Sequence, residues 1–411
     1  MIHKLVKELE NQINLKDFKL NSLLEITRSI NANTPVHEII ELFSYIIKDQ
    51  LHFTKFALFF KEDETWSCLL KHGVRGKIKN IQVENDLKRF KNITYIESSS
   101  YPTLNEFDIV IPVFHKEKPL AYLIMAVDKQ IEAKRQQHLQ FINFIQTLTN
   151  IIVVAIENKR MAKQGIVQER IKKELEVASV MQGLLFPEDL PSNAQMDVSA
   201  KYISRHEVSG DYYDFFPLSD HEYIMCIADV SGKGIGAAIL MANFQATLRT
   251  FYTHQKHDLA FLVQELNKKV MKVAKGEKFI TFFIAEFNLH TRELTYINAG
   301  HNHPILLHQR KATMLKEGTV GLGMFDELPF ISVGKEILKP NTTLIMYTDG
   351  VVELENEQGD DFSVEQLIRL VKLFAPLSME DLNALIFSKL DEWKGKLPYF
   401  DDTAIFSCRF F

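Results

Sequence analysis

Residues 226–238 read CIADVSGKGIGAA and place an aspartate directly between an apolar run and a glycine-rich loop. Residues 223–228 (YIMCIA) form a short apolar run typical of a buried strand, and residues 237–251 have the pattern of a helix. The sequence therefore predicts a strand, a tight turn and a helix, with Asp229 at the end of the strand. A turn in that place can hold the carboxylate rigidly.

Length and composition predict a soluble globular protein. The 411 residues are 46% hydrophobic and 25% charged, so the chain can bury ordinary cores and is expected to form two or three domains. The net charge of -5 offers no broad basic surface for non-specific nucleic-acid binding. The N-terminus lacks the apolar segment of a signal peptide, and the longest apolar stretch, residues 141–156, is too short and too polar to span a membrane. Three separated cysteines form no CxxC pair. We therefore expect a reduced, cytoplasmic protein with no membrane span and no nucleic-acid partner.

The first part of the chain has the pattern of two helices, a strand pair, a variable middle, a strong hairpin and an exit helix. These predicted elements cover residues 18–31, 36–51, 55–61, 65–71, 108–114, 119–127 and about 131–158. The order resembles that of a GAF domain, a small sensory α+β fold, and we predict a GAF-like sensor domain over residues 1–158. Nothing in the segment fixes a ligand, so small-molecule sensing and a structural or dimerising role both stay open.

Residues 159–186 are charged and helix-forming, and five of them are spaced by four and three as in a heptad seam. The seam consists of Ile171, Leu175, Ala178, Gln182 and Leu185. We predict a helical, coiled-coil-like linker over residues 159–189 that pairs two chains into a homodimer. The alternative is a surface helix packed on the next domain, because two heptads are short for a coiled coil.

Aspartates recur in residues 190–411, each beside a residue that lets the backbone turn sharply. The segments are SGDYYD, ADVSG, YTDG and FDDT, which hold Asp211, Asp214, Asp229, Asp349, Asp401 and Asp402. Three of the segments adjoin apolar strand-like runs, and carboxylates at strand ends can converge. Hard divalent cations such as Mg²⁺ and Mn²⁺ prefer oxygen ligands of this kind. A single Asp-Gly is more often an ordinary turn, so the prediction depends on the whole set.

Five motifs occur in order across residues 190–411: SGDYYD, ADVSGKGIGAA, INAGHNHPILL, YTDGVVE and DDTAIF. Together they resemble those of the PPM (type 2C) protein phosphatases, in the bacterial branch typified by the SpoIIE and RsbU phosphatases. The resemblance implies two antiparallel sheets with helices outside, a four-layer αββα sandwich of PP2C type. The whole chain is then expected to be of the α+β class, with the phosphatase domain over residues 190–411.

The resemblance also implies a site for two Mn²⁺ or Mg²⁺ ions, built on carboxylates that serve as the catalytic residues. The residues it places at the metals are Asp229 as the bridging ligand, Val230 through its carbonyl, Asp349, Asp401, Asp211 through a metal-bound water, and Asp214 and Asp402 as supporting or alternative ligands. Those it places at the substrate phosphate are Ser231, Gly232, Lys233 and Gly234. Two such ions activate a water for in-line attack on a phosphate monoester, so no nucleophilic cysteine is required.

Some positions depart from the family pattern. Ser231 stands where eukaryotic relatives carry a histidine proposed as general acid, and the sequence does not identify their phosphate-binding arginine. The proton donor is therefore unassigned. Ser209 replaces a common glycine and Ala404 a common threonine, and neither change removes a carboxylate. His301 and His303 lie in the NAGHNHP turn, where a structural histidine that bonds the loop is favoured over a catalytic one.

The sequence thus predicts a metal-dependent serine/threonine protein phosphatase that is regulated by an N-terminal sensor domain. By the resemblance, the substrate is a phosphoserine or phosphothreonine protein, such as an anti-sigma-factor antagonist of the STAS type. Two alternatives stay open: an inactive signalling scaffold, or pseudophosphatase, and a phosphatase of small phosphate esters. Intact Asp229, Asp349 and Asp401 argue against the scaffold.

A dinucleotide-binding loop is a further interpretation of the glycines. Gly232, Gly234 and Ala237 fit the GxGxxA fingerprint, which expects an acidic residue about 20 positions later. That acid would be Asp258, which stands in a helical-looking stretch rather than at a strand end. The sequence therefore disfavours nucleotide binding.

Overall fold

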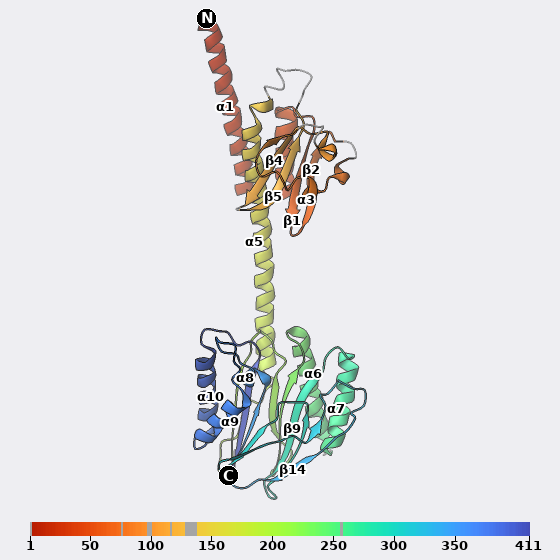
Figure 1. The fold of residues 1–411 in the computed structure, drawn as a ribbon, viewed down its shortest axis with the longest axis vertical. Helices are drawn as coiled ribbons and strands as arrows, with labels where there is room; N and C mark the ends of the chain where they lie inside the picture. The colour runs from red at the N-terminus through yellow and green to blue at the C-terminus, as the bar shows by residue number, and fades with distance from the viewer. Residues whose placement is uncertain (1, 75–76, 97–100, 116, 128–137, 255–257) are drawn as a thin grey trace. The chain divides into compact units, whose positions relative to one another are not determined.

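The computed structural model describes residues 2–74, 77–96, 101–115, 117–127, 138–254 and 258–411 (Figure 1). The chain divides into two compact units, Met1–Gln168 and Glu169–Phe411, and the boundary lies inside a single helix, α5 (Ile142–Gly183). Within the described ranges we find no helix whose length and apolar character would let it cross a membrane.

The first unit contains one five-stranded antiparallel sheet with the strand order β2-β1-β5-β4-β3. Its strands are β1 (Phe56–Glu62), β2 (Thr65–His72), β3 (Thr94–Tyr95), β4 (Ile109–His115) and β5 (Lys118–Met125). The helices described in it are α1 (Ile2–Asn31), α2 (Val36–Tyr45), a π-helical turn (Ile46–Gln50), α3 (Val83–Asp86), two short 3₁₀ turns (Lys77–Asn80 and Pro102–Leu104) and the first part of α5.

The sheet of the first unit is buried on both faces, which explains why its central strands are apolar throughout. In β1, Phe56, Leu58 and Phe60 belong to the core shared with α1, α2 and α5, whereas Ala57 and Phe59 belong to the core on the opposite face. The predicted strands coincide with β1, β2, β4 and β5. The predicted exit helix lies outside the described residues over 131–137 and is part of α5 from residue 142. The GAF-like character of this unit stays a prediction.

The second unit contains two sheets. One has six strands, in the order β13-β10-β9-β8-β7 with β14 also paired to β10, and the other has five, in the order β12-β11-β15-β16-β6. The strands are β6 (Met196–Ile203), β7 (Tyr212–Pro217), β8 (Glu222–Val230), β9 (Ile280–Asn288), β10 (Glu293–Ala299), β11 (Ile305–His308), β12 (Lys311–Met314), β13 (Gly318–Thr319), β14 (Gly334–Ile337), β15 (Thr342–Tyr347) and β16 (Thr403–Phe410). The helices are α6 (Ile235–His254), α7 (Leu259–Ala274), α8 (Asp349–Val352), α9 (Val364–Leu373) and α10 (Met379–Lys394).

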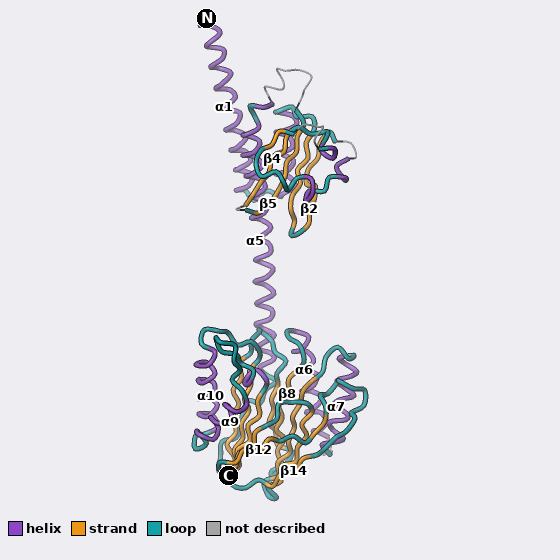
Figure 2. The backbone as a smooth tube through the Cα atoms, viewed as in Figure 1, coloured by secondary structure: helices purple, strands orange, loops and turns teal. Residues whose placement is uncertain are grey.

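Three cores hold the second unit together, and helices lie on both outer sides of the strands (Figure 2). The first core joins the six-stranded sheet to α6 and α7, the second lies between the sheets, and the third joins the five-stranded sheet to α8, α9 and α10. Alternate residues of one strand serve different cores: Cys226 of β8 faces α6, whereas Met225 faces the other sheet. The apolar runs before Asp229 and Asp349 are continuous because both faces of β8 and β15 are covered. The chain is thus of mixed α and β structure, as predicted.

The predicted linker over residues 159–189 contains the C-terminal part of α5, which ends at Gly183, and its residues from Glu169 onward belong to the second unit. Of the predicted seam, Gln182 and Leu185 are partly buried, whereas Ile171 and Ala178 are exposed. Other apolar side chains of this stretch are also exposed, namely Val177, Val180, Met181 and Leu184. Within the second unit, Gln182 bonds to Ser209 and Leu185 packs against the core around α6, which agrees with the surface-helix alternative for the end of the seam. Pairing of two chains through the rest of α5 stays a prediction.

Candidate active site

Carboxylates from both sheets lie at the same edge of the second unit because of where their strands end. Asp229 is the penultimate residue of β8, and Asp211 directly precedes β7, which pairs with β8 through Tyr212 and Ala228. The pairing of Tyr212 with Ala228 therefore brings the adjacent Asp211 beside Asp229. Gly210 permits this approach, since a Cβ built there would lie 2.8 Å from the carbonyl oxygen of Val230.

The five-stranded sheet contributes the other carboxylates in the same way. Asp349 begins α8 just after β15, and Asp401 and Asp402 come just before β16, which pairs antiparallel with β15. The end of β15 and the start of β16 therefore lie together. The four segments that the sequence singled out are thus brought to one place.

The charges of these carboxylates oppose one another. Burial raises the pKa of Asp211 well above its usual range, and the neighbouring Asp229 raises it further. The pKa of Asp229 is raised to about 7, first by burial and then by Asp349, with smaller contributions from Asp401 and Asp402. Burial and Asp401 likewise raise the pKa of Asp349. Carboxylates raise one another's pKa values in this way only when they lie close together and few positive charges lie nearby.

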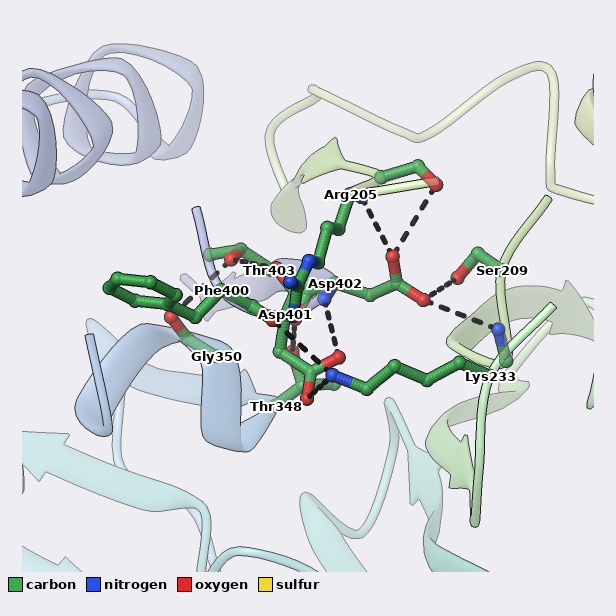
Figure 3. Close-up of polar contacts among 11 residues, drawn as sticks. Arg205, Ser209, Lys233, Thr348, Gly350, Phe400, Asp401, Asp402 and Thr403 are labelled. Carbon is green, nitrogen blue, oxygen red and sulfur yellow. Dashed lines mark hydrogen bonds and ion pairs between the residues drawn. The ribbon is translucent and has the colours of Figure 1, made fainter. Parts of the chain in front are cut away.

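The carboxylate of Asp402 is occupied by hydrogen-bond donors from the segment between β6 and β7 (Figure 3). Its Oδ2 accepts from the Ser209 hydroxyl at 2.5 Å and from the Gly210 N–H at 3.3 Å. Its Oδ1 accepts from the Arg205 N–H at 2.8 Å and from the Ser204 hydroxyl at 3.4 Å. Asp402 therefore ties the two sheets together at the site, whatever further role it has as a ligand.

Asp401 points toward the glycine loop and meets Lys233. The Lys233 Nζ lies 2.8 Å from Oδ2 of Asp401 and donates to the carbonyl oxygen of Phe400 at 3.2 Å. The guanidinium group of Arg205 donates to the same carbonyl oxygen. Lys233 also lowers the pKa of Asp349, against the larger effects of burial and Asp401. A cation from the glycine loop thus compensates part of the carboxylate charge.

The glycine loop adopts a conformation that requires glycine. Gly232 and Gly234 have φ of 81° and 76°, in the left-handed region that other residues rarely adopt. Ser231 anchors the loop: its N–H donates to the Phe279 carbonyl at 2.9 Å, and its hydroxyl accepts from the Phe279 N–H at 2.8 Å. The Lys278 Nζ donates to the Ser231 carbonyl at 2.9 Å and would lie 2.5 Å from a Cβ at Gly232.

Arg205 and Lys278 are the cations at this site that the sequence did not identify. Neither belongs to one of the five motifs, and each reaches the site from a loop that is distant in sequence from the residue it contacts. Only the pairing of the strands brings them there, so no local signal in the sequence could have found them.

Asp214 does not lie at this site, so its expected role as a supporting ligand is wrong. It stands three residues beyond Asp211 in β7, roughly 10 Å along the strand, and its side chain is fully buried. Arg249 of α6 donates to both of its carboxylate oxygens at 2.7 Å, and the Tyr212 hydroxyl and the Phe215 N–H donate as well. This ion pair fastens α6 to the sheet.

The contacts of His301 are compatible with the structural role that the sequence favoured, which stays a prediction. It is buried, its Nδ1 lies 2.8 Å from the Thr281 hydroxyl, and its N–H donates to the Asn298 side chain at 2.7 Å. Burial lowers its pKa to about 4, so it is neutral at physiological pH. Thr281 pairs with Asp229 across β8 and β9, and His301 therefore supports the strand that flanks the carboxylates.

The donor set suits a divalent cation, although the side chains are not yet closed around one. Among the described residues, no group of three or more His, Cys, Asp or Glu side chains is arranged to hold a metal ion. The buried Oδ2 of Asp211 has no hydrogen-bond partner, and within the same residues Lys233 alone forms an ion pair with Asp229, Asp349 or Asp401. Unpaired buried carboxylates are costly, and oxygen donors are those that Mg²⁺ and Mn²⁺ prefer. By the chemistry of their donor atoms, the residues therefore fit a hard divalent cation.

Comparisons with known proteins place similarities in the second unit of the chain. Residues 219–411 match the family model of Stage II sporulation protein E (SpoIIE), a match that begins after the Asp211 motif. Over 196 residues, 47% of this chain and 57% of the relative, the sequence is 30% identical to phosphoserine phosphatase RsbU of Bacillus subtilis. It is 27% identical to phosphoserine phosphatase RsbP of the same organism, over 44% of this chain and 46% of that one.

Among solved structures, the SiaA-PP2C domain of Pseudomonas aeruginosa superposes with a TM-score of 0.54 at 20% identity. The superposition covers 60% of this chain and 99% of that domain, so the second unit has a PP2C-like fold. The chain spans about half the length of the curated relatives that it matches.

Proposed function

We propose that this chain is a metal-dependent serine/threonine protein phosphatase, because residues 219–411 match the SpoIIE family model and the second unit has a PP2C-like fold. The observation that carries the proposal is the convergence of Asp211, Asp229, Asp349 and Asp401 at one edge of two sheets. The layering of helices outside two packed sheets supports the four-layer αββα architecture of the domain.

The chain's own residues divide the work of the reaction. Those proposed to hold two Mn²⁺ or Mg²⁺ ions are Asp229, the Val230 carbonyl, Asp349, Asp401, Asp211 and Asp402. When bound, such ions polarise the phosphoryl oxygens and activate a water for in-line attack. Buried carboxylates with raised pKa values take up protons when no cation is present, so cation binding displaces those protons.

The substrate phosphate is proposed to meet Ser231, Gly232, Lys233 and Gly234. A Cβ built at Gly234 would meet nothing within 4 Å, so this side of the loop is open to an incoming group. Lys233 supplies a positive charge beside it, and charge-assisted contacts favour a phosphoryl group. Because Ser231 uses its hydroxyl to anchor the loop, the proton donor for the leaving group stays unassigned.

Removal of the metal tests this function directly. We expect the full chain to hydrolyse a chromogenic phosphate monoester when Mn²⁺ is added. Hydrolysis should stop with excess EDTA and return when Mn²⁺ is restored. A phosphoserine protein should compete with the small ester and have the higher kcat/KM, which separates a protein phosphatase from a phosphatase of small esters. Mn²⁺ binding without hydrolysis of either substrate would contradict the proposal and support the scaffold.

We further propose that the N-terminal GAF-like domain, residues 1–158, regulates the site through the linker over residues 159–189. Gln182 of α5 bonds both ways to the backbone of Ser209: its Nε2 donates to the carbonyl at 2.7 Å, and its Oε1 accepts from the N–H at 3.1 Å. The Ser209 hydroxyl then donates to Asp402 and accepts from the Asp211 N–H at 3.0 Å. Two hydrogen-bonded steps thus connect the helix to two site carboxylates.

The Gln182→Ala variant tests this connection. We expect turnover and Mn²⁺ affinity each to fall by about tenfold, because lost hydrogen bonds worth about 1 to 1.5 kcal/mol no longer hold Ser209 and Asp211 in place. Steady-state kinetics and Mn²⁺ titration provide the measurements, and Gln168→Ala, an exposed glutamine of the same helix, is the matched control. An unchanged Gln182→Ala enzyme, or a chain that lacks residues 1–158 and keeps the same rate and metal affinity, would contradict regulation by this route.

By the resemblance, we propose that the substrate is a phosphorylated signalling protein such as a STAS-type anti-sigma-factor antagonist, and that the protein acts in the cytoplasm. We also propose a homodimer formed through α5. The exposed side chains of Val177, Val180, Met181 and Leu184 support pairing, because apolar side chains spaced along a solvent-exposed helix favour contact with another helix.

A further inference from the structure

Lys233 extends from the glycine loop of one sheet to the carboxylate of Asp401 at the end of the other (Figure 3). Its Nζ lies 2.8 Å from Oδ2 of Asp401. Oδ1 of the same carboxylate accepts from the backbone N–H of Asp402 at 2.9 Å. The Lys233 ammonium group therefore contacts Oδ2 of Asp401, the oxygen that is not bonded to the Asp402 backbone and could bind a cation.

Lys233 also donates to the Phe400 carbonyl, but the loop that carries Asp401 has further contacts that do not involve Lys233. The Arg205 N–H, the Ser209 hydroxyl and the Gly210 N–H all donate to Asp402, and the Arg205 side chain donates to the adjacent Phe400 carbonyl. These contacts remain when Lys233 leaves, so its release leaves the carboxylate in place.

The ion pair between Lys233 and Asp401 is of a kind that is readily replaced by another interaction. The side chains of Lys233 and Asp401 are 45% and 41% exposed, and solvent-exposed ion pairs contribute little free energy. Lys233 stands between Gly232 and Gly234, and the space beside Gly234 is open. The lysine side chain therefore has both a weak attachment and room to move away from Asp401.

Within the described part of the chain, Lys233 is also the one cation that pairs with Asp229, Asp349 or Asp401. These carboxylates lie close enough to oppose each other's ionisation. A positive charge at Asp401 relieves that repulsion in the absence of a metal, as its effect on Asp349 indicates. A divalent cation at the same oxygen would do so more strongly, because it has twice the charge.

We propose that Lys233 competes with the metal ion for Asp401: it neutralises the carboxylates when no ion is bound, and ion binding releases it to the open side of the glycine loop. This inference rests on the proposed metal-dependent function and deepens it. The released ammonium group is then available to the phosphate of the substrate, so Lys233 couples metal loading to the readiness of the phosphate site. Because the metal ion must displace Lys233 from Asp401, the site binds the ion less tightly than it would without Lys233.

Calorimetric titration of the full chain with MnCl₂ and without substrate tests the competition independently of turnover. We expect Lys233→Met to bind Mn²⁺ about three to ten times more tightly than the unsubstituted chain, because the competing charge is gone. Lys233→Arg keeps that charge and should stay within about twofold of the unsubstituted affinity. Lys335→Met is the matched control, since Lys335 forms an exposed ion pair with Glu293 at 2.8 Å, outside the carboxylate cluster.

Unchanged or weaker Mn²⁺ binding by Lys233→Met would overturn the inference, and so would equal tightening by Lys335→Met, which would indicate a general effect of net charge. Thermal unfolding of each variant in EDTA checks that it is folded. If the unsubstituted chain binds no Mn²⁺, the proposed function fails together with the competition. If it binds Mn²⁺ and hydrolyses phosphate esters while Lys233→Met has the same affinity, the competition alone is wrong.

Discussion

The Asp229→Asn variant is expected to lose catalysis and to gain stability in the absence of metal. Asp229 is the carboxylate proposed to bridge two ions, and an amide is a neutral and weaker ligand. We therefore expect Mn²⁺-supported kcat to fall by at least about 10³-fold, which corresponds to about 4 kcal/mol of transition-state stabilisation. The measurement is steady-state hydrolysis of a phosphate monoester at pH 8 with Mn²⁺.

The gain in stability follows from the raised pKa of Asp229. Burial and the neighbouring carboxylates raise this pKa to about 7 in the folded protein, whereas an unfolded aspartate titrates near its ordinary value of about 3.9. An acid whose folded pKa is raised favours folding in its protonated form, so it lowers the free energy of unfolding as pH rises from about 4 to about 7. Asparagine removes this cost, which reaches up to about 4 kcal/mol above pH 7 at about 1.4 kcal/mol per unit.

Thermal unfolding in EDTA at pH 5 and pH 8 measures this effect. Asp229→Asn should raise the midpoint clearly at pH 8 and much less at pH 5, where the aspartate is mostly protonated in the folded state. Asp220→Asn, at an exposed position in the turn before β8, is the matched control and should alter neither turnover nor the pH dependence. Retained turnover would contradict the role of Asp229, and a stability gain that is equal at both pH values would contradict its origin in charge.

The sequence predicted where the strands of the site end because that prediction depends only on residues that are neighbours along the chain. A run that is apolar at every position requires a strand covered on both faces, and the residue after it must then lie at a sheet edge. Asp229 at the end of β8 and Asp349 just after β15 each follow such an apolar run. The order of the motifs added the family resemblance, so the sequence alone singled out the carboxylates that the structure brings to one edge of the sheets.

Contacts between distant segments account for what the sequence did not predict. Asp401 and Asp402 are adjacent and look equivalent, yet Asp401 meets Lys233, whereas Asp402 is held by Ser209 and the Arg205 N–H. Which partner each acid meets depends on how two sheets are packed, and spacing along the chain does not encode it. The same holds for Asp214, whose motif resembles that of the phosphatases but whose side chain meets Arg249 of α6.

The Arg249→Met variant is expected to lower the free energy of unfolding by about 3 to 5 kcal/mol, the cost of leaving a buried charge without its partner. Asp214 is fully buried, and Arg249 donates to both of its oxygens at 2.7 Å. The guanidinium group also lies 5.5 Å from the centre of the Phe216 ring, a cation–π contact that methionine loses as well. Chemical denaturation measures the loss, to which the ion pair contributes most.

A second substitution separates the buried charge from the other contacts of Arg249. Asp214→Asn in the Arg249→Met background removes the unpaired charge, so the double variant should recover at least about 1.5 kcal/mol of the loss. Mn²⁺ affinity should be unchanged in either folded variant, because Asp214 lies away from the carboxylates at the strand ends. A loss below about 1 kcal/mol, or a double variant no more stable than Arg249→Met, would contradict the ion pair's role in fastening α6 to the sheet. Mn²⁺ binding that is weaker in the folded double variant than in folded Arg249→Met would instead return Asp214 to the list of supporting ligands, because the two variants differ only in the Asp214 carboxylate.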